Sequence, residues 1–345
     1  MGPLITTIIP TYKRPQLLKK AIESVLNQTY PHFTLCIYDN ASDDATEEVA
    51  LSYVSKDARV KYYKHRENIG ATANFAFGLT RVETLFFSFL SDDDILLPNF
   101  YETALEGFKK YPEAGFFCGT VILSNEVGRV IHVTTLPWKD TEYYEPPGGL
   151  FEMIPKHLDW MGILFKKEVR DQIGGIDTQI KAIDVDFLYR AAARYPFVVS
   201  KKPCGIFFQH SQSYSYYAGL KVIWPGWLSM LENIKKDPLL SPDDILKVEQ
   251  LFEKDINKKL IFVFIHNLKR KDFVDCIKVL QVLKGYCKRS CLVCGLLCVV
   301  RLVQWIPLLH PVFCLMLKAR QLLLKRKRVL QRSFGSYLGL LQGGN

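Results

Sequence analysis

The segment Ser91-Asp92-Asp93-Asp94, with three consecutive acids, directly follows the apolar run Leu85–Leu90. Such a run is typical of a buried strand, so the carboxylates are expected at that strand's carboxyl end. Adjacent carboxylates repel one another unless a cation or a basic partner lies beside them. Mg²⁺ and Mn²⁺ prefer oxygen ligands, commonly one or two carboxylates together with substrate phosphates. In an extended segment Asp92 and Asp94 would share a side and form a metal and diphosphate clamp. The alternative is an acidic N-terminus of the helix expected near Pro98.

Two further loops carry groups that suit a nucleotide. Pro10–Arg14 and Tyr38–Asp44 each follow a strand-like run and precede a helical pattern. Helix N-termini favour anions, and Arg14 adds a bidentate donor for phosphate. Asp39 could accept a hydrogen bond from a base N–H or a ribose hydroxyl. Ordinary capping and turn chemistry would account for the same residues. The chain lacks the glycine fingerprints of dinucleotide oxidoreductases and P-loop NTPases, which argues against both classes.

The elements that must position these loops alternate between strands and helices. This order predicts an α/β fold with a doubly wound, largely parallel sheet, whose ligands bind beyond the carboxyl ends of the strands. A hairpin is expected around Asn125–Gly128, and the pattern is mostly helical from Ser229 onward. The expected strands are Leu4–Ile9, Thr34–Tyr38, Val60–Tyr63 and Leu85–Leu90, and the expected helices begin near Pro15, Asp44, Ala71 and Pro98.

Composition and charge suggest two regions. The chain has 345 residues, of which 48% are hydrophobic and 23% charged, which excludes a disordered chain or a small disulfide scaffold. Residues 1–255 carry a net charge of −5, whereas residues 256–345 carry +15. We therefore expect a catalytic region over 1–220 and a helical, basic region over 221–345. Nine cysteines without a secretory signal indicate reduced thiols and a cytoplasmic protein.

The basic region predicts a partner surface. Cys291–Leu317 is strongly apolar but interrupted by charged residues and prolines, and Lys318–Arg332 is dense in cations. Apolar residues followed by cations are typical of a segment bound peripherally to an anionic membrane, here its inner face. A membrane-spanning or re-entrant segment and a core or dimer helix are the alternatives, so a homo-oligomer stays open. Nucleic acid is not expected because no nucleic-acid-binding motif accompanies the cations.

In combination, these motifs resemble the family 2 glycosyltransferases of GT-A fold, which are inverting enzymes, over about residues 1–215. The resemblance implies a nucleotide-sugar donor, a divalent cation (Mn²⁺ or Mg²⁺) and a glycan or lipid-linked acceptor. It rests on four segments in order: Pro10-Thr11-Tyr12, Asp39–Asp44, Glu67-Asn68-Ile69-Gly70 and Leu90–Pro98. It implies that the donor is bound by Pro10, Thr11, Tyr12, Arg14, Asp39, Asn68 and Asp92.

The resemblance also implies metal ligands and a base. Serine at position 91 stands where the family often has its first acid, so Asp93 takes the main ligand role, with Asp94 and His210 beside it. The segment Ile183–Arg190 resembles the family's acidic pair with a downstream arginine, which implies Asp184 as the general base. Asp184 as a simple N-cap is the alternative, with Asp186 pairing with Arg190 four residues on.

The sequence thus predicts a metal-dependent inverting glycosyltransferase. Two alternatives stay open: a membrane-docked scaffold that has lost activity, and a sugar nucleotidyltransferase. The second would want a Gly-rich phosphate loop after the first strand, which this chain lacks.

Overall fold

A computed structural model describes residues 2, 4–125, 127–140, 142–180, 182–210 and 220–286, and, beyond these, residues 295, 297, 298 and 300. One mixed sheet runs through the first two thirds of the chain, with strand order β3-β2-β1-β4-β9-β6-β10-β5, and β7 and β8 pair with β6 and β10. The strands are β1 Ile5–Thr11, β2 Phe33–Asp39, β3 Val60–Lys64, β4 Phe86–Phe89, β5 Ile95–Leu96, β6 Phe116–Asn125, β7 Val130–Val133, β8 Glu142–Tyr144, β9 Ile163–Lys166 and β10 Phe197–Gln209.

The first half of this sheet is the one that the strand and helix alternation predicts. Strands β3, β2, β1 and β4 are parallel neighbours, and β6 pairs in parallel with β10. Short antiparallel strands β9 and β5 complete the sheet, and β6 forms the expected hairpin with β7. The fold is therefore α/β with a mostly parallel sheet, and the predicted fold class is confirmed.

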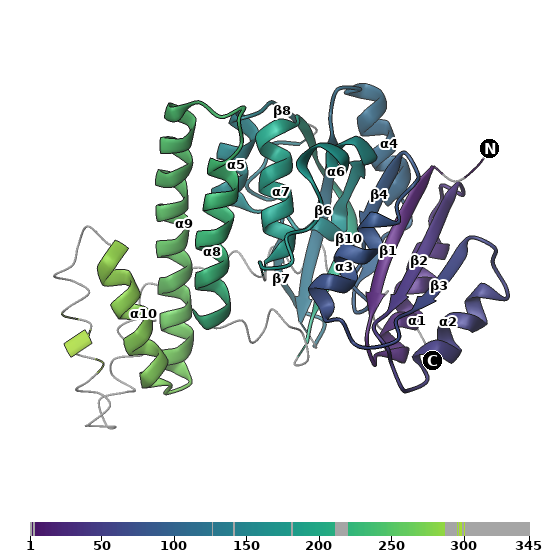
Figure 1. Cartoon of the computed structure of the whole chain (residues 1–345), viewed down its shortest axis with the longest axis horizontal. Helices are drawn as coiled ribbons and strands as arrows, with labels where there is room; N and C mark the ends of the chain where they lie inside the picture. The colour runs from purple at the N-terminus through teal and green to yellow at the C-terminus, as the bar shows by residue number, and fades with distance from the viewer. Residues whose placement is uncertain are drawn as a thin grey trace.

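Helices cover the sheet and extend beyond one end of it (Figure 1). Long helices α8 and α9 lie beside α7, on the side away from β1–β3, and α10 packs against α9. The helices are α1 Pro15–Leu26, α2 Thr46–Val54, α3 Ala71–Thr80, α4 Phe100–Lys110, α5 Gly148–Lys156, α6 Lys167–Ile173, α7 Ile183–Arg194, α8 Leu220–Lys235, α9 Pro242–Lys269 and α10 Phe273–Tyr286, with a 3₁₀ turn η1 at Trp160–Gly162.

One hydrophobic core joins the sheet to the helical region. Phe87 and Phe165 of the sheet belong to the same buried cluster as Trp227 of α8 and Phe252 and Leu260 of α9. Helix α9 begins with a capping box, in which Ser241 and Asp244 each accept from the other's backbone N–H. The helical region is thus packed on the sheet region, and it brings its own side chains close to the site described below.

The predicted membrane-binding segments, Cys291–Leu317 and Lys318–Arg332, lie almost wholly outside the described residues. Among the residues that are described, no helix is long and apolar enough to cross a membrane.

Candidate active site

The first two loops meet at the carboxyl ends of β1 and β2. Thr11 lies opposite Asp39 in the parallel register, and the Asn40 N–H donates to the Thr11 carbonyl over 2.9 Å. Asp39 is fully buried and accepts from the Ser42 N–H (2.9 Å) and the Tyr62 hydroxyl (2.7 Å). Asp39 therefore holds the second loop in shape at the place where the sequence predicts a nucleotide contact.

A third loop closes onto the second one. The Asn40 side chain donates to Asn68 Oδ1 over 2.8 Å and accepts from the Ile69 N–H over 2.8 Å. The Lys13 N–H donates to Ser42 Oγ over 2.9 Å, which ties the first loop to the second. Of the predicted donor residues here, Pro10 is a buried residue of β1 and Tyr12 is an exposed aromatic. These contacts make one rim from three separate loops.

The acidic segment is a turn, not an extended strand. The Asp94 N–H donates to the Ser91 carbonyl over 3.1 Å, so side chains no longer alternate between two sides. Asp92 points towards the first loop and accepts from Thr11 Oγ1 over 2.7 Å, whereas Asp94 Oδ1 accepts from the Phe208 N–H of β10 over 2.9 Å. The prediction that Asp92 and Asp94 share a side is therefore wrong, because a local hydrogen bond closes the turn.

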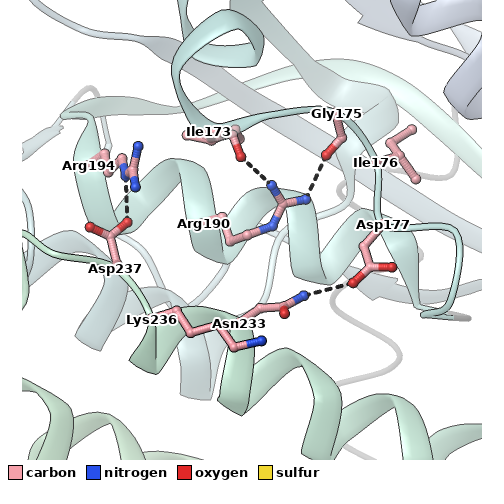
Figure 2. A pocket seen from close by; sticks show the side chains of 9 residues that line it. All are labelled: Ile173, Gly175, Ile176, Asp177, Arg190, Arg194, Asn233, Lys236 and Asp237. Atoms are coloured by element: carbon pink, nitrogen blue, oxygen red, sulfur yellow. Dashed lines mark hydrogen bonds and ion pairs between the residues drawn. The ribbon is translucent and has the colours of Figure 1, made fainter.

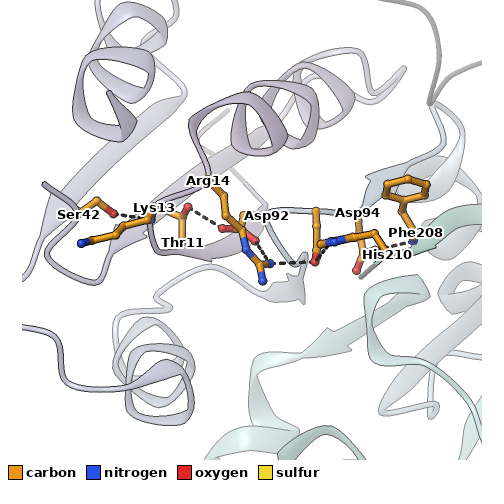
Figure 3. A network of polar contacts seen from close by, with 9 residues as sticks. Thr11, Lys13, Arg14, Ser42, Asp92, Asp94, Phe208 and His210 are labelled. Atoms are coloured by element: carbon orange, nitrogen blue, oxygen red, sulfur yellow. Dashed lines mark hydrogen bonds and ion pairs between the residues drawn. The ribbon is translucent and has the colours of Figure 1, made fainter. Parts of the chain in front are cut away.

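Asp93 belongs to a network of polar contacts, and Figure 3 labels its partners Arg14 and His210. Its Oδ2 lies 2.9 Å from Arg14 Nη1 and 2.9 Å from His210 Nε2. Arg14 Nη1 also reaches Asp92 Oδ1 at 3.1 Å. The structure thus brings together Thr11, Arg14, Asp92, Asp93 and His210, which come from β1, the turn after β4 and the end of β10.

Negative charge exceeds positive charge in this network. Burial and the neighbouring Asp93 raise the pKa of Asp92 to about 6, although Arg14 and Thr11 oppose the shift. Burial, followed by the charge of Asp93, raises the pKa of Asp94 well above its usual range. Three carboxyl groups with one guanidinium leave room for a further cation. Carboxylate oxygens are ligands that suit Mn²⁺ or Mg²⁺, and Asp93 lies together with His210 here.

These residues are not arranged as a ready-made metal site. Across the described ranges, no three His, Cys, Asp or Glu side chains have the geometry to hold an ion. Asp94 turns to the Phe208 N–H, and the Arg14 guanidinium lies against both Asp92 and Asp93. The assignment of Asp93, Asp94 and His210 as metal ligands stays a prediction.

The predicted base lies on the first turn of α7. The N-cap residue is Ala182, so Asp184 is not the N-cap that the alternative explanation requires. Burial raises the pKa of Asp184, while the N–H groups of Val185 and Asp184 itself and the charges of Lys259 and His157 work against that shift. Asp186 pairs with Arg190 at 2.8 Å, as the spacing predicts.

Asp159, just before η1, links the two acidic groups. Its carboxyl interacts electrostatically with Asp94 on one side and with Asp184 on the other. Burial, followed by the charge of Asp184, raises the pKa of Asp159 to about 7. Asp184 therefore belongs to the same polar region as the acidic turn, although 90 residues separate them in the chain.

A pH-dependent stability effect follows from Asp159. The folded protein keeps this proton up to about pH 7, whereas an unfolded chain releases it near ~3.9. Since the folded state binds more protons in this window, wild-type stability falls as the pH rises through it. We expect Asp159→Asn to remove that fall. The urea midpoint of the variant should therefore exceed that of the wild type by more at pH 7.5 than at pH 4.5. Equal differences at both pH values would contradict this assignment.

Polar contacts around a cavity of about 310 Å³ hold helix α7 in place (Figure 2). Arg190 donates to the carbonyls of Ile173 (2.8 Å) and Gly175 (2.9 Å), and so holds the turn ahead of α7. Asn233 of α8 donates to Asp177 of that turn (3.0 Å) and to Asp186 (3.2 Å). The cavity lies on the side of α7 that carries Arg190 and Arg194, and its contacts fix the helix that bears Asp184.

Sequence reasoning missed three residues near the base: Asp159, His157 and Lys259. Asp159 and His157 lie in an irregular stretch after α5, and Lys259 is one of several lysines on α9. No motif singles them out, because they meet only through tertiary packing.

Comparisons with known proteins agree with this geometry. Residues 6–165 match the family described as glycosyl transferase family 2, which confirms the resemblance. Over 105 residues the chain is 33% identical to the GalNAc(5)-diNAcBac-PP-undecaprenol beta-1,3-glucosyltransferase of Campylobacter jejuni, covering 30% of this chain and 34% of that one. The first eight curated relatives are aligned over only 14% to 49% of their own length.

Solved structures show the same fold. The S. aureus TarS 1-349 complex with UDP-GlcNAc superposes with a TM-score of 0.65 at 16% identity, covering 84% of this chain and 83% of that one. The mannosyltransferase PcManGT from Pyrobaculum calidifontis, in complex with GDP-Man and Mn²⁺, gives a TM-score of 0.55 at 13% identity, with coverages of 98% and 88%. The architecture is therefore that of GT-A glycosyltransferases.

Proposed function

We propose that the protein is an inverting glycosyltransferase that moves a sugar from a nucleotide-diphosphate sugar to a hydroxyl group of a glycan or lipid-linked acceptor. The observation that carries this proposal is the convergence of the first loop, the acidic turn and His210 beside the Asp159 and Asp184 carboxyls. The family match and the undecaprenol-linked substrate in the Campylobacter relative's name support it.

In this proposal each group has one task. The Asp184 carboxylate accepts the proton of the acceptor hydroxyl as its oxygen attacks the anomeric carbon. The new C–O bond forms as the bond to the diphosphate oxygen breaks, and the nucleotide leaves with the electron pair. Arg14 and His210 face the diphosphate, and the rim of Thr11, Tyr12, Asp39 and Asn68 holds the nucleoside. A divalent cation at Asp93 would neutralise charge on the diphosphate.

Two further features belong to the proposal. Residues 221–345 would form the basic region that docks on the inner face of an anionic membrane, next to a lipid-linked acceptor. The protein would then act in the cytoplasm as a peripheral membrane enzyme. The net charge of +15 over residues 256–345 supports this placement.

The first experiment is nucleotide release from UDP-, GDP-, dTDP- and CMP-sugars with Mn²⁺, with Mg²⁺ and with EDTA. We expect slow hydrolysis of one nucleotide-diphosphate sugar that EDTA abolishes, because water can replace the acceptor hydroxyl. Turnover that EDTA leaves unchanged would remove the metal from the proposal. Silence with every donor, together with no nucleotide binding in calorimetry, would favour the inactive scaffold instead.

A further inference from the structure

A second polar cluster lies between α5, α7 and α9, outside the donor loops. His157, which ends α5, places Nε2 3.0 Å from Asp255 Oδ1 of α9 and Nδ1 3.0 Å from the Tyr189 hydroxyl of α7. Asp255 Oδ2 lies 3.3 Å from the ammonium of Lys259, one turn further along α9. The cluster thus joins the helical region to the base helix α7 and to the stretch that carries Asp159.

Lys259 occupies an unusual position for a lysine. Its ammonium lies 3.4 Å from the centroid of the Trp227 ring, and only 30% of its side chain is exposed. Burial lowers the pKa of Lys259, and the charges of Asp255 and Asp184 oppose that shift. Burying a cation is costly unless carboxylates compensate its charge. Here one carboxylate, Asp255, comes from α9 itself, and the other, Asp184, comes from α7.

The hydrogen bonds of His157 fix its place between α9 and α7. The Asp255 carboxylate can only accept, so Nε2 donates the proton of that hydrogen bond. The Tyr189 hydroxyl contacts Nδ1 and also reaches the Ile154 carbonyl at 3.3 Å. His157 thereby holds Asp255, the partner of Lys259, beside α7.

Four groups face Asp184 from the elements packed around it. Asp159 approaches from the stretch before η1, His157 from the end of α5, Tyr189 from α7 itself and Lys259 from α9. Asp159 disfavours ionisation of Asp184, whereas positive charge on Lys259 or His157 favours it. Lys259 is the larger of the two favourable charges acting on Asp184.

We infer that Lys259 is a positioning residue of the active site, which α9 supplies to keep the base Asp184 ionised, and that the His157–Asp255 pair holds Lys259 in place. This inference rests on the proposed function, in which Asp184 is the base. It makes the helical region a part of the catalytic machinery and not only a docking element, since α9 supplies the larger of the two favourable charges that act on this carboxylate.

The first test is the pH profile of kcat/KM for hydrolysis of the donor found in the nucleotide-sugar panel. Loss of a cation beside a carboxylate raises its pKa, so Lys259→Met should move the acid limb upward by about one pH unit. Lys259→Arg should restore the wild-type limb. Lys258→Met, at the exposed neighbouring position, is the matched control and should leave the profile unchanged. An unmoved limb in Lys259→Met would overturn the inference.

The second test needs no activity, so it separates this inference from the proposed function. Urea midpoints of the full-length protein are compared for wild type, Lys259→Met, Asp184→Asn and the double variant at pH 7.5. If the two charges interact, the effect of Lys259→Met should fall to about half in the Asp184→Asn background. Additive effects would overturn the inference even if the donor is hydrolysed. Coupling without hydrolysis of any donor would retain the charge pair and reject the glycosyltransferase proposal.

Discussion

Asp184→Asn should lower donor turnover by about 10³-fold, while donor affinity stays within about twofold of wild type. An amide of the same size cannot accept the proton of the attacking hydroxyl, yet it keeps the shape of the site. Among the residues that the structure describes, no hydrogen bond joins Asp184 to a donor loop. Nucleotide binding should therefore survive. Steady-state nucleotide release and calorimetric titration with the nucleoside diphosphate measure the two quantities separately.

The free energies of unfolding of two variants provide a control for this prediction. Burial raises the pKa of Asp184, which means that folding disfavours the ionised carboxylate. Asp184→Asn should therefore not destabilise the fold. Burial also raises the pKa of Asp186, but Asp186→Asn should behave in the opposite way, because it removes the ion pair with Arg190. Breaking such a pair costs about 3 kcal/mol or more, whereas the remaining folded enzyme should still turn over. A variant pair with the reverse pattern would identify Asp186 as the base.

The predictability of the fold follows from where the strong local signals lie. The apolar runs that become β1, β2, β3 and β4 are each followed by a helical pattern, and this alternation is enough to predict a parallel sheet. The short strands β5 and β8 carry no such signal. They form because their long neighbour β10 presents backbone groups that need partners.

The sequence predicts which loops form the site, because each of these loops follows a strand. The site residues come together because they lie just beyond the carboxyl ends of β1, β4 and β10, as ligand sites do in other sheets of this kind; they are Thr11, Arg14, Asp92, Asp93 and His210. The direction in which each acidic side chain points was not predictable. One hydrogen bond from the Asp94 N–H closes the turn and replaces the expected alternation.

The residues around the base mark the limit of sequence reasoning. His157 and Asp255 are 98 positions apart, and nothing in either segment shows that they meet. Lys254, Lys258 and Lys259 look alike in the sequence, but only Lys259 of the three turns towards Trp227 and Asp184. Their difference comes from the packing of α9 on α5 and α8, which residue types alone do not encode.

Asp93→Asn should lower metal-dependent donor turnover by about 10²-fold and raise the Mn²⁺ concentration needed for half-maximal rate. Asp93 Oδ2 is the atom that Arg14 and His210 share, so Asp93 already lies beside the imidazole that would help to hold the ion. Replacing the carboxylate by an amide removes one negative charge there and weakens the attraction for a divalent ion. Mn²⁺ titration followed by electron paramagnetic resonance measures binding directly.

Asp94→Asn is the matched variant for this prediction. Asp94 Oδ1 accepts from the Phe208 N–H, and an asparagine oxygen can make the same hydrogen bond. If Asp93 is the principal ligand, Asp94→Asn should therefore change Mn²⁺ affinity less than Asp93→Asn does. The reverse order would make Asp94 the principal ligand and would require the turn to open on metal binding. Equal and negligible effects of both variants, with turnover that EDTA does not change, would instead leave Arg14 as the cation that faces the diphosphate.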